Sequence, residues 1–267
     1  MITSANCLHA GLATTPDIEE PEPVSGLSAD LGITIANQYI TRGYMVQDEG
    51  TSFQPHLDLV ANVYQGDGFI TSASAFLGLW AVVSSTPYGE QSNRFTEFDY
   101  GPGFTVSFAK RWTFTTFYNR WTSPAGAYDD GHWLSGAIEF DDSGLLHKDF
   151  SLKPFLEMTQ DLDISGMSGL CLETGIRPSV TFFPGSATPV ITTLVIMTGL
   201  GNGYYGDDYG YLAIGPQVSV PLEFIHPSAG EWSLTAECLY HDFGSGLAGY
   251  NRKSHDVLFS VGVNVGF

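Results

Sequence analysis

The last nine residues of the chain, FSVGVNVGF, alternate strictly between large apolar side chains and small or polar ones. Two sets share the segment: Phe259, Val261, Val263, Val265 and Phe267 are apolar, and Ser260, Gly262, Asn264 and Gly266 are small or polar. Successive side chains of a β-strand point to opposite faces, so this pattern predicts a strand between two different environments.

The same alternation returns along most of the chain. It is clearest in residues 31–45, 53–64, 97–108, 211–224 and 231–241. About twelve such segments can be counted, which lies within the range of closed membrane barrels. In residues 69–83 and 189–200 both faces are apolar or small, so the sequence leaves their orientation open.

Composition narrows the class of protein. The formal net charge is -19 and the sequence pI is about 4.4, which excludes a nucleic-acid role, because phosphate binding requires clustered Lys and Arg. Charged residues make up only 15% of the chain, whereas soluble domains carry about 25%. No run approaches the roughly 18 consecutive apolar residues that a transmembrane helix needs. Alternating strands therefore account best for the apolar content.

The connections between the strands alternate in length. Tight turns are predicted at 65–68, 110–111, 141–144, 184–189 and 226–230, and longer links near 44–52, 84–94, 122–131, 160–168, 200–208 and 242–254. Short turns at one rim and longer loops at the other are typical of outer-membrane barrels. We therefore expect an all-β protein: a closed antiparallel transmembrane β-barrel of about twelve strands, over residues 28–267. Residues 1–27 are acidic and proline-rich and predict a disordered N-terminal segment.

The ends of the chain predict how the barrel closes and where it resides. In lipid every backbone polar group must be paired, so the last strand is expected to pair with the first. A terminal Phe267 resembles the signal by which bacterial outer-membrane proteins reach their insertion machinery. The predicted location is the bacterial outer membrane, with periplasmic termini. The expected partners are outer-membrane lipid and lipopolysaccharide, the insertion machinery and small solutes, and a homo-oligomer is compatible with this location.

Aromatic residues near the predicted strand ends suit the interfacial girdles of such barrels. The candidates are Tyr39, Phe53, Phe69, Phe98, Trp112, Phe140, Phe150, Trp232, Tyr240 and Phe267.

The first predicted hairpin, NQYITRGYMVQDEGTSFQPHLDL, is similar to the start of the bacterial barrels called TorF-like porins. The matching residues are Tyr39, Arg42, Gly43, Asp48, Glu49, Gln54 and Pro55. Thr41 departs from the pattern, since an aromatic or apolar residue is common there. The resemblance covers about two strands and implies an outer-membrane barrel with a transport role. It assigns no catalytic residue.

The polar faces of the strands supply the candidate site. The predicted lumen residues are Gln38, Arg42, His56, Asp58, Asn62, Glu97, Asp99, Lys153, Glu157, Glu173, Arg177, Glu223, Glu237 and His241. Carboxylates outnumber bases, so an open pore is expected to favour small cationic or neutral solutes. Arg42, on the first strand, is the expected counter-charge. Alternatively, paired charges such as Glu173 with Arg177 fill a barrel that serves a structural or assembly role without transport.

A lipid-modifying hydrolase is the rival function. The available pieces are His56 with Asp58 and His241 with Asp242, near Ser245, but they form no catalytic motif with a fixed spacing. Acidic residues also gather in the predicted outer loops: Asp48, Glu49, Asp129, Asp130, Asp161, Asp163, Asp207 and Asp208. They lack the ligand series of a calcium loop, and the three cysteines have no metal-binding spacing, so neither a metal nor a cofactor is expected.

Overall fold

The computed structural model of the protein describes residues 26–163 and 169–267. The predicted N-terminal segment therefore lies outside the described residues, except for its last two positions. The wall strands are β1 (Leu27–Ala36), β4 (Ser52–Gln65), β5 (Ile70–Tyr88), β6 (Asn93–Phe108), β7 (Trp112–Thr122), β8 (Gly131–Phe140), β9 (Phe150–Ser151), β10 (Phe155–Asp161), β11 (Leu170–Ile176), β12 (Ser179–Phe182), β13 (Val190–Leu200), β14 (Tyr209–Pro221), β15 (Glu231–Phe243) and β16 (His255–Gly266). A separate hairpin consists of β2 (Tyr39–Thr41) and β3 (Tyr44–Gln47). The helical elements are α2 (Asn202–Tyr205), α3 (Ser245–Asn251) and the 3₁₀ turn η1 (Pro227–Ala229).

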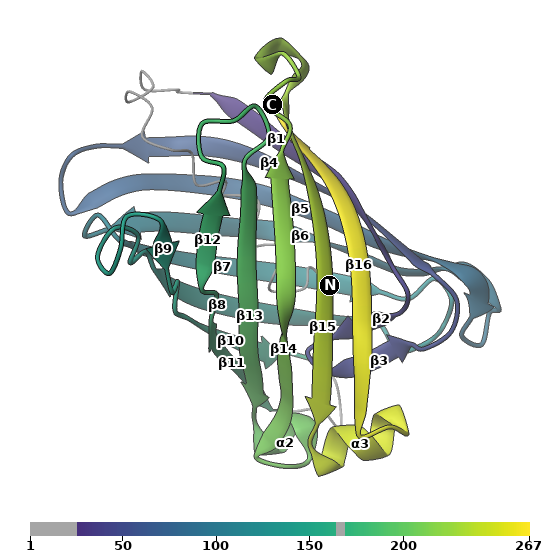
Figure 1. The fold of residues 1–267 in the computed structure, drawn as a ribbon. Helices are drawn as coiled ribbons and strands as arrows, with labels where there is room; N and C mark the ends of the chain where they lie inside the picture. Colours follow the sequence, from purple (N-terminus) through teal and green to yellow (C-terminus); the bar gives the residue numbers. More distant parts are fainter. Residues whose placement is uncertain (1–25, 164–168) are drawn as a thin grey trace.

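The wall is a closed antiparallel β-barrel (Figure 1). The segments β9 and β10 lie end to end in one strand position, as do β11 and β12, and Arg177 N–H donates to Leu152 O at 2.7 Å between them. With these two positions counted once each, the described residues form twelve wall strands. The pairing of β11 with β13 completes the circle. The predicted fold class is confirmed.

The seam between the first and last strands closes as expected. In the β1–β16 ladder Ile33 lies opposite Val263 and Ile35 lies opposite Val261, so the apolar faces of both strands continue one another. Phe267 extends the seam, since its N–H donates to Ala29 O at 2.8 Å and its carbonyl accepts from Ala29 N–H at 3.1 Å.

The two ends of the barrel differ. The terminal end, defined by Leu27 and Phe267, carries the connections 66–69, 109–111, 141–149, 183–189 and 222–230. The loop end, opposite to it, carries α2 and α3 (Figure 1). Two predicted lengths were wrong. Strands β5 and β6 run on as a long hairpin, so the loop expected at 84–94 shrinks to residues 89–92, and the tight turn expected at 141–144 is part of a longer link.

The outer face of the wall is apolar. Outward side chains that are more than a third exposed include Leu31, Ile35, Leu59, Leu77, Phe104, Leu134, Leu194, Leu234, Phe259 and Val261. Aromatic pairs lie at the terminal rim, where the Trp112 and Phe140 ring centroids are 4.7 Å apart and those of Phe69 and Phe108 are 5.7 Å apart. None of the helices in the described residues is long and apolar enough to cross a membrane.

Val265 departs from this arrangement. It belongs to the outward face, but it is only 5% exposed. A Cβ atom added at Gly230 would lie 2.5 Å from Val265 Cγ2, so the connection after η1 covers this side chain.

The first connection does not stay in the wall, which corrects the expectation of one strand through residues 31–45. Strand β1 ends at Ala36, and the chain then turns inward as the β2–β3 hairpin, called here the lumen hairpin (residues 38–47). Its turn residues Arg42 and Gly43 have φ of 45° and 78°, as a two-residue hairpin turn requires. Tyr39, expected in the outer girdle, is only 1% exposed and lies inside the barrel.

Candidate functional site

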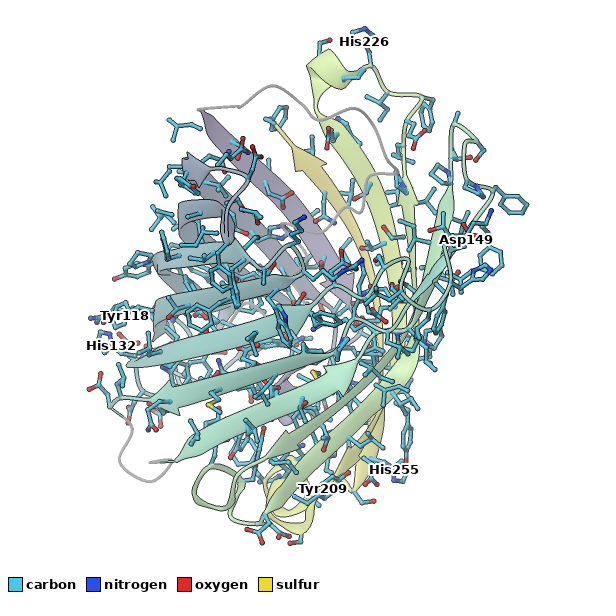
Figure 2. All side chains as sticks on the ribbon, turned by 90° about the vertical axis from the view of Figure 1, so that its left-hand side faces the viewer. Tyr118, His132, Asp149, Tyr209, His226 and His255 are labelled. Atoms are coloured by element: carbon cyan, nitrogen blue, oxygen red, sulfur yellow. The ribbon has the colours of Figure 1, made fainter. Side chains whose placement is uncertain are left out.

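The lumen hairpin fills the barrel interior towards the loop end with two apolar clusters. One face of the hairpin contributes Ile40 and Met45 to a cluster with Tyr204, Tyr211, Phe243 and Leu247. The other face contributes Tyr39 and Val46 to a cluster with Trp80, Val82, Phe117 and Trp133. Figure 2 shows side chains crowding the interior, with Tyr209 and His255 marking the loop end and His226 the terminal end.

This packing explains the two strands whose orientation the sequence left open. Phe76, Trp80 and Val82 of β5 point inward and belong to, or pack against, the cluster that contains Tyr39 and Val46. Leu77 and Val83 point outward. Strand β13 behaves alike, with Val195 buried and Leu194 exposed. Both faces are apolar because one side lies on the outer surface and the other faces the apolar interior.

Polar contacts tie the lumen hairpin to the wall. The side chain of Asn251 in α3 accepts from Met45 N–H at 2.9 Å and donates to Gly43 O at 2.8 Å. Tyr44 Oη donates to Tyr204 O at 2.6 Å. Backbone groups inside the barrel cannot all bond to water, so these contacts satisfy polar atoms that would otherwise be costly to bury.

The lumen wall is acidic, as expected. The inward carboxylates on the wall strands include Asp30, Asp58, Glu97, Asp99, Glu139, Glu157, Glu173 and Glu237. Most of them were predicted from the sequence, but Asp30 and Glu139 were not. The alternation signal that could have found them is present, since Asp30 lies on the same face as Gly32, and Glu139 on the same face as Ala137.

Glu97 and Asp99 lie on β6 where this strand faces the lumen hairpin. Glu97 accepts hydrogen bonds from Tyr39 Oη at 3.1 Å and from the Tyr128 hydroxyl. Asp99 Oδ2 accepts from Asn119 Nδ2 at 2.8 Å. Glu97 therefore binds the lumen hairpin directly, and Asp99 joins β6 to β7 beside it.

Glu173 does not pair with Arg177, which corrects the predicted ion pair. Residues four apart on one strand lie about 13 Å apart along it, too far for a direct contact. Instead, Arg177 Nη1 lies 3.0 Å from Glu139 Oε1, with both side chains buried. Glu173 accepts a hydrogen bond from the Tyr211 hydroxyl and lies across the β10–β11 ladder from Glu157.

Arg42 is the second lumen arginine, but it lies in the turn of the lumen hairpin rather than on the first strand. Its Cζ lies 4.4 Å from the centroid of the Trp133 ring, and its Nη1 is 3.4 Å from the Tyr204 hydroxyl. Arg42 is therefore a positive charge inside the barrel, as expected, but its predicted place on the first wall strand was wrong.

Of the other predicted lumen residues, His56 and Asp58 face the lumen and Glu223 does not. His56 points inward and its Nε2 lies 3.1 Å from Asp30 Oδ1, while Asp58 is buried beside it on the same face. The prediction that Glu223 faces the lumen was wrong, because β14 ends at Pro221 and Glu223 is exposed in the connection at the terminal end.

A cavity of about 90 Å³ lies beside the turn of the lumen hairpin. Its polar lining includes Gln38, Arg42, Gln54, Glu173, Gln217, Glu237 and His241. Gln217 Nε2 donates to Glu237 Oε2 at 3.0 Å. Amides, carboxylates and a guanidinium thus line a space that is large enough for a small polar molecule.

Of the residues proposed for a hydrolase, Ser245, His241 and Asp242 are not brought together. Ser245 is exposed at the start of α3 and donates to Asp207 at 2.6 Å, whereas His241 is buried and faces the lumen. Asp242 faces outward and accepts from the Tyr209 hydroxyl at 2.8 Å. The acidic loop residues gather at the loop end, and among the described residues no group of three or more His, Cys, Asp or Glu could hold a metal ion.

Comparison with known proteins identifies the fold. No family model and no curated protein matches the sequence. The structure is similar to the COG4313 outer membrane channel from Pseudomonas putida F1, with a TM-score of 0.51 and 10% identity over 95% of this chain and 100% of that chain. Two other structures are more distant. The KdgM porin in complex with disordered oligogalacturonate has a TM-score of 0.45 and 8% identity over 90% of this chain and 99% of that chain. LpxR from Salmonella typhimurium has a TM-score of 0.45 and 6% identity over 88% of this chain and 99% of that chain.

At these identities the likeness concerns the fold alone. Together with the closed strand order and the apolar outer face, it defines the class: an all-β, closed antiparallel transmembrane β-barrel. Within that class, this chain has twelve strands and a hairpin packed inside the lumen.

Proposed function

We propose that this protein is a porin-like channel of the bacterial outer membrane, for passive diffusion of small solutes, with a preference for cationic or neutral ones. The observation that carries the proposal is the contrast between the two faces of the wall. The outer face is apolar, whereas the inner face carries buried carboxylates on β4, β6, β8, β10 and β11 and a half-buried one, Glu237, on β15.

The cation preference rests on the balance of charge in the lumen. Asp58 and Glu237 lie on the wall away from the contacts that hold the lumen hairpin, and Glu237 lines the cavity. The guanidinium groups of Arg42 and Arg177 are the buried basic charges inside the described barrel. Acidic side chains lower the barrier for positive ions, so a solute in this lumen meets a negative potential.

Solute passage depends on the position of the lumen hairpin. In its present position it fills the interior near the loop end, so solute passage there requires its displacement. Its resemblance to the first hairpin of TorF-like porins supports a transport role. The Arg-Gly pair of that resemblance forms the hairpin turn.

The orientation and partners belong to the same proposal. Periplasmic termini suit a terminal end that carries tight turns such as 66–69 and 109–111, and the exposed Phe267 suits recognition by the insertion machinery. Outer-membrane lipid surrounds the apolar face, lipopolysaccharide lies beside the acidic loop end, and a homo-oligomer would form through the wall.

Solute efflux from liposomes tests the proposal. Vesicles that contain the refolded protein should release small cationic and neutral solutes faster than anionic solutes of equal size. Equal retention of all three, combined with hydrolysis of phospholipid or lipid A that depends on His56 or His241, would favour the hydrolase. Retention without hydrolysis would favour a structural or assembly barrel.

A further inference from the structure

Both arginines inside the barrel stack on an aromatic ring. Arg177 Cζ lies 4.0 Å from the centroid of Phe155, and Arg42 Cζ lies 4.4 Å from that of Trp133. Each has buried carboxylates nearby. A guanidinium is planar and weakly hydrated, so it stacks on aromatic faces and pairs with carboxylates better than a compact ammonium does. The lumen is therefore built to bind guanidinium groups.

The two arginines differ in how firmly they are held. Arg177 follows β11 in the wall, its backbone N–H bonds to Leu152, and its side chain forms the 3.0 Å ion pair with Glu139. Arg42 belongs to the lumen hairpin. Among the described residues it has no ion pair within 4.0 Å, and its hydrogen bond to Tyr204 is long, at 3.4 Å. Arg42 is the more displaceable of the two cations.

Arg42 lies beside an acidic pair on the wall. Glu157 and Glu173 lie directly opposite each other in the β10–β11 ladder, and their side chains are 6% and 1% exposed. Arg42 and Glu173 line the same cavity, and Glu157 is the neighbour of Glu173 across the ladder. If Arg42 moves away, it leaves a space beside this acidic pair and the Trp133 ring that another guanidinium group can take.

A cavity borders this position. The cavity of about 90 Å³ is lined by both Arg42 and Glu173, together with the amide side chains of Gln38, Gln54 and Gln217. A small polar solute in that cavity would be adjacent to the guanidinium of Arg42. The cavity thus places an incoming solute where it competes with Arg42.

We propose that Trp133, Glu157, Glu173 and Tyr204 form a binding site for guanidinium-bearing solutes, and that Arg42 occupies it as an internal ligand in the resting protein. A permeating solute of this class displaces Arg42 and with it the turn of the lumen hairpin. The inference rests on the proposed channel function, since the solute reaches the site through the lumen, and it adds the chemical class of the solute.

The test measures binding to the full chain in detergent by titration calorimetry, using guanidinium ion at concentrations far below denaturing ones. Urea is the matched control because it has the same planar shape without the charge, and sodium chloride controls for ionic strength. Arg42→Ala should bind guanidinium roughly tenfold more tightly than the unmodified chain, and this gain should disappear in Arg42→Ala/Glu157→Gln. Equal affinity in both chains, or equal binding of urea, would overturn the proposal.

Two further measurements keep the result interpretable. Heat-modifiable migration on a gel shows whether Arg42→Ala closes its barrel, and Arg42→Gln replaces it if it does not. In the unmodified chain, guanidinium but not urea should accelerate hydrogen exchange of residues 39–47, and identical exchange with both would also contradict the site. Binding is measured without current, so a chain that binds guanidinium but does not conduct refutes the channel alone, and one that conducts without binding it refutes the site alone.

Discussion

Asn251 and Met45 are joined by a hydrogen bond of 2.9 Å, from the backbone N–H of the lumen hairpin to the side-chain carbonyl of a helix at the loop end. The amide nitrogen of the same side chain donates to Gly43 O at 2.8 Å. The side chain of Asn251 thus satisfies one backbone donor and one backbone acceptor of the lumen hairpin. It is 6% exposed, so water cannot easily replace either bond.

Replacing this side chain should loosen the lumen hairpin without opening the wall. Asn251→Ala removes both bonds and leaves a buried N–H and a buried carbonyl unsatisfied, at a cost of about 1–3 kcal/mol for each group. We expect faster hydrogen exchange in residues 39–47, with heat-modifiable migration unchanged. Ser245→Ala, on the exposed start of the same helix, is the control. Unchanged exchange in Asn251→Ala would contradict the role of this side chain.

The facing of the last strand can be tested with neighbouring positions. Val261 points outward and is 54% exposed, whereas Ser260 points inward and lies opposite Glu237. Val261→Arg should destabilise the barrel by roughly 2–4 kcal/mol if it lies near the membrane midplane. Ser260→Arg should cost far less, because its charge meets a carboxylate. The measurement is refolding equilibrium into lipid vesicles, and similar losses at both positions would mean that the facing is wrong.

Close strand approach at Gly101 gives a third prediction. A Cβ atom there would lie 1.8 Å from Tyr118 O, a backbone atom that cannot move aside easily. Gly101→Ala should therefore destabilise the barrel by about 1–3 kcal/mol. Gly136→Ala is the matched control, since its Cβ would lie 3.6 Å from the nearest atom, in ordinary contact with Phe114. The temperature at which gel migration changes should fall for the first variant only, and an equal change in both would contradict this packing.

Side-chain alternation predicted the facing of the wall strands whose two faces differ in polarity, but it left β5 and β13 open. Along β6 it separated Glu97 and Asp99 from Phe98 and Tyr100, as the structure has them. The reason is physical: a membrane barrel requires opposite chemistry on its two faces, and a strand turns alternate residues to each.

The same signal misled where the chain leaves the wall. Tyr39 falls on the apolar register of β1, and Gln38 and Arg42 fall on its polar register, so the segment resembled a continuation of β1. In the structure both faces of the lumen hairpin pack into apolar clusters. The apolar inner face of β5, with Phe76, Trp80 and Val82, was the available sign of a packed interior. Pairings between strands, such as Glu139 with Arg177, depend on register across the barrel and could not be predicted from spacing alone.

The central claim, a channel with an acidic lumen, is tested most directly by planar-bilayer conductance under a salt gradient. Three chains should be compared: the unmodified protein, Asn251→Ala, and Asp58→Asn/Glu237→Gln in the Asn251→Ala background. Cation-selective current should be larger in Asn251→Ala than in the unmodified protein, and its reversal potential should shift towards zero when the two carboxylates are neutralised. Absence of current in all three chains, or anion selectivity in Asn251→Ala, would contradict the account.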